Sequence, residues 1–382
     1  MNTRINEKGE AIRRFIVDNV EKHPRTIAKE ASEHFKISRQ AANKHLQKLT
    51  GEGFLTETGN TRNRTYKLVP LSTWHKTYDI IPGLAEDVVW TEDVASSLGQ
   101  PPDNVRAIWH HGFTEMFNNA IDHSGGSTIA VKVIRTAANA EMMIRDNGVG
   151  IFRKIQKALN LLDERHAILE LSKGKLTTDP KNHSGEGIFF TSRMFDSFEI
   201  LSGDAFFSHE YGKPQDWLLE SKRENVGTAV FMRLYNHTAR TTRKVFDAYA
   251  SGEEFDFTKT VVPVDLARYG NDKLISRSQA KRVLARVELF KAVVFDFKGV
   301  DYIGQAFSDE IFRVFANEHP GIQLHAIHAN SEVRRMIDRA RSGAGLVTET
   351  VTTQDAQEER ESLGGSNSGS DDRNKKSIHR SG

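Results

Sequence analysis

Four polar residues near the middle of the chain have types and spacing that could serve a bound ligand. These are Glu115, Asn119, Asp122 and His123. Their spacing places them on one stripe of a helix, because an α-helix returns to the same face every three to four residues. A helix face in contact with water would show the same pattern. The stripe alone therefore leaves a ligand site and a solvated surface as alternatives.

The residues after this stripe favour a ligand site. Residues 128–134 alternate in polarity as a strand does, and residues 141–145 suggest a second strand. The sequence Asp-Asn-Gly-Val-Gly at 146–150 then ends the second strand with turn-forming residues. We interpret the helix, the strand pair and the glycine turn as half of a nucleotide site.

Two motifs in this stretch resemble a known family. The pattern E-x-x-x-N-A-x-D at 115–122 and the pattern D-x-G-x-G at 146–150 are similar to the N box and the first glycine box of the GHKL ATP-binding family. That family includes gyrase B, the ninety-kilodalton heat-shock chaperones, histidine kinases and the anti-sigma-factor serine kinases. The resemblance implies an ATP-binding domain at 103–236, built as an α/β sandwich with helices on a mixed sheet.

The same resemblance implies roles for three residues of the polar stripe. Glu115 would orient or deprotonate an attacking nucleophile, and Asn119 would hold a magnesium ion that bridges the phosphates. Asp122 would bind nucleotide or orient its neighbours. Mg²⁺ suits such a site because it prefers oxygen ligands and takes only one or two of them from the protein.

The glycine turn would hold the base. By resemblance, Asp146 would accept a hydrogen bond from the adenine amino group. Gly148 and Gly150 would let the backbone approach the base and sugar, because glycine has no Cβ.

Two further segments complete the resemblance. Gly185 and Gly187 open the helical sequence 189–198 and resemble the second glycine box, whose amide groups would face phosphate. Residues 152–183 would then form the lid over ATP. Thr228, in a Gly-Thr pair that starts a predicted strand, resembles the threonine that reaches the adenine site.

The first 70 residues are basic and form a separate predicted domain. They contain 14 Lys or Arg and 8 Asp or Glu, a net charge of +6, whereas the whole chain has only +2. Three predicted helices and a hairpin resemble a winged helix-turn-helix, whose third helix enters the DNA major groove. The residues predicted to contact double-stranded DNA are Arg39, Gln40, Asn43 and Lys44 on that helix, with Arg62 and Arg64 on the wing. The alternative is that this module contacts another protein and does not bind DNA.

The remaining segments are assigned more coarsely. Residues 71–102 are predicted to be a connector of short helices or strands packed between two domains. Residues 255–341 alternate strand and helix, and residues 296–315 resemble a STAS-like family of unknown function. The loop before Ser308 lacks the hydroxyl that phosphorylatable antagonists carry there, and Ser308 is interpreted as a helix cap. Residues 342–382 have few apolar side chains and are predicted to be disordered.

Composition limits the class of protein. The chain of 382 residues has no cysteine, so disulfides and thiolate metal sites are excluded. The N-terminal sequence lacks the apolar core of a signal peptide, and no run approaches the roughly 18 apolar residues of a membrane span. We therefore expect a cytoplasmic, multidomain α+β and α/β protein without a membrane partner.

The order of these segments leads to two main hypotheses. The first is an ATP-responsive DNA-binding regulator that couples a Mg-ATP site to a STAS-like module and its protein partner. The second is a GHKL-type ATPase or serine protein kinase that acts on a STAS-like partner. The sequence is compatible with a homodimer but does not specify the oligomeric state.

Overall fold

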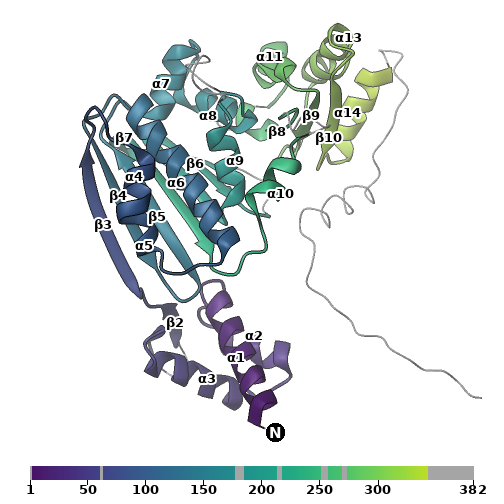
Figure 1. Ribbon diagram of the computed structural model, residues 1–382. Helices are drawn as coiled ribbons and strands as arrows, with labels where there is room; N and C mark the ends of the chain where they lie inside the picture. The colour runs from purple at the N-terminus through teal and green to yellow at the C-terminus, as the bar shows by residue number, and fades with distance from the viewer. Residues whose placement is uncertain are drawn as a thin grey trace, which may run out of the picture.

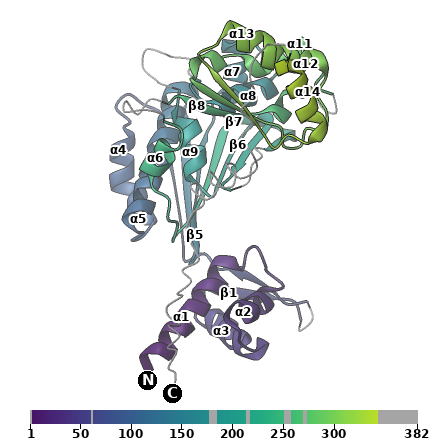
Figure 2. The same cartoon turned by 90° about the vertical axis from the view of Figure 1, so that its right-hand side faces the viewer.

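The computed structural model describes residues 2–60, 63–176, 185–212, 217–250, 257–268 and 273–342. Within these ranges the chain forms three modules, which we call the N-terminal, central and C-terminal modules. Two views at right angles place the N-terminal and C-terminal modules at opposite ends of the central sheet (Figure 1, Figure 2).

The N-terminal module has three helices and a two-stranded hairpin. Its elements are α1 (Asn2–Asn19), α2 (Ile27–Phe35), α3 (Arg39–Gly51), β1 (Leu55–Thr58) and β2 (Thr65–Leu68). The sequence predicts Ser38, a residue type common at helix N-termini, as the cap of the third helix. Ser38 does cap α3, because its hydroxyl accepts a hydrogen bond from the Ala41 amide at 3.1 Å. Lys36 has a left-handed backbone, which makes the sharp turn between α2 and α3. The apolar face of α3 includes Ala42 and Leu46. These residues are buried in a hydrophobic core of the N-terminal module that is separate from the main core of the chain.

The central module is built on one five-stranded sheet in the order β3-β4-β5-β7-β6. Its strands are β3 (Ser72–Asp79), β4 (Thr128–Arg135), β5 (Asn139–Asp146), β6 (Ser197–Glu210) and β7 (Trp217–Tyr235). Every pair of neighbouring strands is antiparallel, so the predicted mixed sheet is wrong. Only residues 136–138 separate β4 from β5, and a parallel pair would need a crossover of about a dozen residues.

Helices cover one face of this sheet (Figure 1). They are α6 (Asp103–His123), α7 (Ile151–Ala158), α8 (Glu164–Lys173), α9 (Gly187–Met194) and the short helices α4 (Glu86–Val89), η1 (Trp90–Val94) and α5 (Ala95–Ser97). Ile129, Val131 and Val133 alternate along β4 and are buried beneath the helices. The strand residues between them are less buried, as expected for a sheet with one covered face.

The predicted connector is part of the central module. β3 pairs with β4 along its full length, from Ser72 opposite Arg135 to Asp79 opposite Thr128. The side chain of Asp93 ties the following helices to β3. It accepts hydrogen bonds from the Tyr78 hydroxyl at 2.8 Å and the Lys76 ammonium at 2.6 Å.

Two helix ends differ from those that the sequence predicts, which are a cap on α6 by Asp103 or Asn104 and a helix over 189–198. α6 begins at Asp103 after Pro102, and neither Asp103 nor Asn104 caps it with its side chain. The amide of Asn104 instead donates to the carbonyls of Thr238 and Arg240, both at 2.8 Å, and so holds the chain that leaves β7. α9 ends at Met194 because Phe195 is already extended.

The C-terminal module follows α10 (Thr242–Asp247) and has a three-stranded parallel sheet. Its strands β8 (Lys259–Pro263), β9 (Ala292–Asp296) and β10 (Gln323–Ile327) lie side by side in chain order. The helices around them are η2 (Val264–Ala267), α11 (Arg277–Leu284), η3 (Val287–Leu289), α12 (Gln305–Asp309), η4 (Glu310–Phe315), α13 (Ala316–Glu318) and α14 (Ser331–Ser342). The predicted alternation of strand and helix is confirmed.

Two details of this module correct the sequence predictions. The sequence predicts a helix that starts at Ser276 or Ser278 and continues through 279–290, but α11 ends at Leu284, because Ala285 is not helical and Arg286 is left-handed with φ of 63°. Ser308 is not a helix cap. Its hydroxyl is buried and donates to the Met336 carbonyl at 2.9 Å, while Gly304 occupies the cap position.

No helix within the described ranges is long and apolar enough to cross a bilayer. The predicted disordered tail lies, from residue 343 onward, outside the described residues.

Candidate functional site

A cavity of about 330 Å³ lies between the helices and the sheet of the central module. Its lining comes from α6, α7, α8, α9 and the strands β5, β6 and β7. The volume is in the usual range for small-molecule sites. Six predicted nucleotide residues line it, namely Glu115, Asn119, Asp146, Gly185, Gly187 and Thr228.

One wall of the cavity is organised around the carboxylate of Asp146, at the end of β5. Its Oδ1 accepts hydrogen bonds from the amides of Gly148 at 2.8 Å and Thr228 at 3.2 Å. The Thr228 hydroxyl in turn accepts from the Ile151 amide at 3.0 Å, at the start of α7. Burial raises the pKa of Asp146, and these hydrogen bonds oppose the shift. The carboxylate of Asp146 is therefore a hydrogen-bond acceptor that backbone amides of β7 and of the turn after β5 hold in place.

Gly227 makes this arrangement possible. It has φ of 80°, and a Cβ there would lie 2.1 Å from the carbonyl oxygen of Asp146. Both the backbone angle and the contact exclude a larger residue. The sequence placed Gly227 in a predicted strand but did not include it among the site residues.

A second wall pairs the polar stripe of α6 with the first turn of α9. A Cβ at Gly187 would lie 1.9 Å from Oε2 of Glu115, so the glycine lets the carboxylate approach the helix end. Glu115, Asn119 and His123 are spaced four residues apart and all line the cavity. The amide groups at the start of α9 give this side a partial positive charge.

Three predicted residues do not line the cavity. Asp122 is exposed, because it lies off the stripe that the other three residues share. Gly148 supports the site through its amide, as described above. Gly150 precedes α7, and its carbonyl accepts from the amide of Lys154 at 3.1 Å.

The predicted lid is described only up to residue 176. That part forms α7 and α8, and residues 177–183 lie outside the described residues. Leu171 on α8 and Leu176 beyond it line the cavity. α8 is thus part of the cavity wall, with its residues 166–173 buried.

One further cavity residue, Lys154, was not predicted from the sequence. This lysine lines the cavity, and its ammonium donates to the His123 carbonyl at 2.9 Å, at the end of α6. A lysine in the first turn of a helix that follows a glycine is hard to recognise as a site residue from the sequence, because exposed helix faces are rich in lysine.

Four of the residues predicted to contact DNA lie on the exposed face of α3. Arg39, Gln40, Asn43 and Lys44 are all exposed on α3, opposite its buried face. Arg64 on the hairpin is partly buried and forms an ion pair with Glu57 at 3.3 Å. Arg62 lies outside the described residues.

The side-chain oxygen atoms that line the cavity suit a cation that is coordinated both by the protein and by a bound small molecule. No group of three or more His, Asp or Glu side chains that could hold a metal occurs in the described part of the chain. Glu115 and Asn119 supply one carboxylate and one amide oxygen to the cavity. Mg²⁺ bound through phosphate commonly takes only one or two protein ligands of this kind.

Comparison with known proteins identifies one segment. Residues 279–334 match the family described as STAS-like domain of unknown function (DUF4325). No curated protein gives a significant match to the chain. The matched segment runs from α11 into α14 and does not include the cavity. The C-terminal module therefore contains a STAS-like domain.

Proposed function

We propose that the chain is an ATP-responsive transcriptional regulator. In this proposal the central module is a GHKL-like domain that binds Mg-ATP in the cavity, and the N-terminal module is a winged helix that binds double-stranded DNA. The observation that carries the proposal is the convergence of six residues, predicted from separate motifs, on one cavity.

Several groups in the cavity support the proposal that it binds Mg-ATP. Asp146 would accept from the adenine amino group, since its carboxylate is fixed and buried. Asn119 would hold Mg²⁺ together with phosphate oxygens, and the bound ion would neutralise phosphate charge. Lys154 would supply a further positive charge, and the amides at the start of α9 would face phosphate.

Asp146→Asn tests nucleotide binding. The asparagine keeps an oxygen for the amides of Gly148 and Thr228 but directs N–H donors at the base, where an acceptor is needed. We expect Mg-ATP affinity, measured by calorimetry on the full chain, to fall by at least about tenfold. Asp204→Asn, at an exposed position of β6, is the matched control and should bind as wild type. Equal affinity of both variants and wild type would contradict the proposed adenine contact.

A second candidate is a GHKL-type ATPase or serine protein kinase. It is favoured by the approach of Glu115 to the start of α9, which would place a carboxylate close to the phosphates. Incubation with ATP labelled at the γ-phosphate separates the functions. Label on protein supports a kinase, release of phosphate alone supports an ATPase, and intact ATP supports a binding switch.

A further inference from the structure

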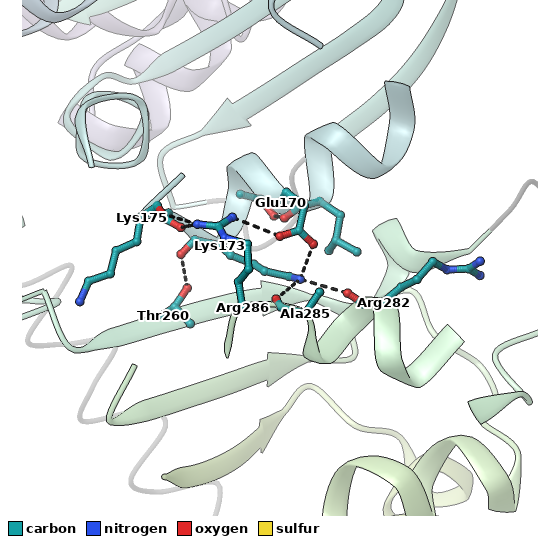
Figure 3. A network of polar contacts seen from close by, with 10 residues as sticks. Glu170, Lys173, Lys175, Thr260, Arg282, Ala285 and Arg286 are labelled. Carbon is teal, nitrogen blue, oxygen red and sulfur yellow. Dashed lines mark hydrogen bonds and ion pairs between the residues drawn. The ribbon is translucent and has the colours of Figure 1, made fainter. Parts of the chain in front are cut away.

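Helix α8 has a buried charged network on the side that faces the C-terminal module (Figure 3). Lys173 is fully buried and Glu170 has only 4% of its side chain exposed. Such groups are rarely buried unless they are paired and fully hydrogen-bonded. Their partners in the C-terminal module come from the end of α11 and the turn that follows it.

The ammonium of Lys173 has three acceptors. Nζ donates to Oε1 of Glu170 at 2.7 Å, to the carbonyl of Ala285 at 2.7 Å and to the carbonyl of Arg282 at 3.0 Å (Figure 3). An ammonium has three N–H groups, so its hydrogen-bonding capacity is filled. The two carbonyls lie at the end of α11, where helix carbonyls have no partner within the helix. Lys173 therefore caps the C-terminal end of a helix in another module.

Arg286 makes the reciprocal contact. Its guanidinium donates to Oε2 of Glu170 at 3.1 Å and to the carbonyl of Gly174 at 3.2 Å, and it also contacts the carbonyl of Lys175. These carbonyls follow the last residue of α8. Each helix thus ends against a cation from the other module, and the carboxylate of Glu170 joins the two cations.

The attachment extends to the sheet of the C-terminal module. The hydroxyl of Thr260 on β8 donates to the carbonyl of Lys173 at 2.6 Å, and both groups are buried. α8 is therefore held by a strand as well as by the end of α11. We call Glu170, Lys173, Thr260 and Arg286 the α8 latch.

The same short segment forms part of the cavity. Leu171 lies between Glu170 and Lys173 in sequence, and Leu176 follows the carbonyls that Arg286 contacts. A displacement of α8 relative to the C-terminal module would disturb the latch contacts and the cavity wall together. The two sites therefore share one structural element, as coupling between sites requires.

We propose that the STAS-like C-terminal module controls ligand affinity of the cavity through the α8 latch, with Lys173 and Arg286 as positioning residues. The proposal rests on the proposed function, because it identifies Mg-ATP as the ligand that is regulated. A protein partner that displaces the end of α11 would weaken nucleotide binding without touching the cavity. By reciprocity, bound nucleotide would hold the C-terminal module more firmly on α8.

The test compares two substitutions that remove the same charge. Arg286→Gln breaks the latch, whereas Lys281→Gln changes an exposed residue of α11 whose side chain is 71% exposed. We expect Arg286→Gln to weaken Mg-ATP binding to the full chain by about tenfold, a typical size for coupling between sites. Lys281→Gln should stay within about twofold of wild type, and Arg286→Lys should recover part of the affinity because it keeps the charge.

Hydrogen exchange gives the readout that distinguishes coupling from loss of stability. In wild type, Mg-ATP should slow amide exchange in α8 and also in η3, which follows Arg286. In Arg286→Gln the ligand should still slow exchange in α8 but no longer in η3. If Arg286→Gln does not fold, Glu170→Gln provides a second break in the same network.

The outcomes separate the two proposals. Unchanged affinity in the latch variants, or ligand protection that never reaches η3 in wild type, would overturn the latch and leave nucleotide binding intact. Failure of wild type to bind Mg-ATP would overturn the proposed function itself, and the regulation with it.

Discussion

The two outer modules are attached to the central module in different ways. The N-terminal module contacts the turn between β4 and β5, where Ala138 is buried in its core and the amide of Asn139 donates to Glu21 at 2.9 Å. The C-terminal module contacts a helix of the cavity wall through the α8 latch. Strand β5 connects the N-terminal contact with the cavity, because Asn139 begins the strand and Asp146 ends it at the cavity.

This difference indicates how each module can respond to a ligand. The C-terminal module contacts an element that lines the cavity, so a ligand bound there would act on it directly. The N-terminal module is separated from the cavity by the length of β5, eight residues or about 26 Å. An effect of ATP on DNA binding would therefore have to pass along the sheet or through association of chains.

The largest expected effect is on stability at the C-terminal contact. Lys173→Met leaves Glu170 buried with only part of its charge compensated and removes the cap from α11. The free energy of unfolding should fall by about 3–5 kcal/mol, the usual cost of breaking a buried ion pair from one side. Chemical denaturation measures it, with Lys281→Met as the exposed control. A loss below about 1 kcal/mol would mean that the network contributes little to the attachment.

Acid should weaken the packing of α6 against α10. Burial, with a smaller effect of His110, lowers the pKa of His111 to about 4 from its usual 6.5, and its ring packs against Phe246 of α10. The unfolded chain therefore binds the proton more readily, and stability should fall as pH drops from 6.5 towards 4. The loss is at most about 3 kcal/mol. His111→Gln, followed by denaturation at several pH values, should remove that part of the pH dependence, and an unchanged profile would contradict it.

A smaller effect is expected for DNA binding by the N-terminal module. Asn43→Ala removes an exposed amide suited to adenine and should cost about 1–3 kcal/mol of specific affinity. Mg-ATP affinity should not change, because α3 is remote from the cavity. Binding of duplex DNA by the full chain should also weaken steeply with salt. Absent or salt-insensitive binding would favour the alternative that this module contacts protein.

The smallest effect is expected at the N-terminal contact. Glu21→Gln keeps an acceptor for the Asn139 amide and removes only a charge, so stability should change by less than about 1 kcal/mol. Nucleotide affinity should remain that of wild type. Thermal unfolding and calorimetry would check both quantities. A loss as large as that of Lys173→Met would remove the contrast between the two attachments.

The sequence predicted local elements well where capping and periodicity act over a few residues. Ser38 caps α3, Ser276 begins the capping box of α11, and the strands of the C-terminal module lie where apolar runs occur. The sequence did not predict the features that depend on contacts between segments far apart in the chain. Asn104 looked like a helix cap but binds carbonyls more than 130 residues away, and the antiparallel sheet depends on how β7 returns beside β5.

The candidate site was predicted in part for the same reason. Glu115, Asn119 and Asp146 belong to short motifs, so their spacing carried a signal. Lys154 has no motif, and its position in the cavity depends on the packing of α7 against the end of α6. Lys173 and Arg286 are 113 positions apart and meet only because the two modules pack together. The binding of nucleotide and DNA stays a prediction.

The reciprocal helix ends also affect how the protein can be divided. If the chain were cut between the central and C-terminal modules, the carbonyls of Arg282 and Ala285 would lose the lysine that caps them, and those of Gly174 and Lys175 would lose their arginine. Each fragment would then have a frayed helix on the surface that was formerly shared. The smallest piece that keeps both helix ends intact therefore includes the central and C-terminal modules together, and a fragment boundary chosen from the STAS-like match alone would omit half of this arrangement.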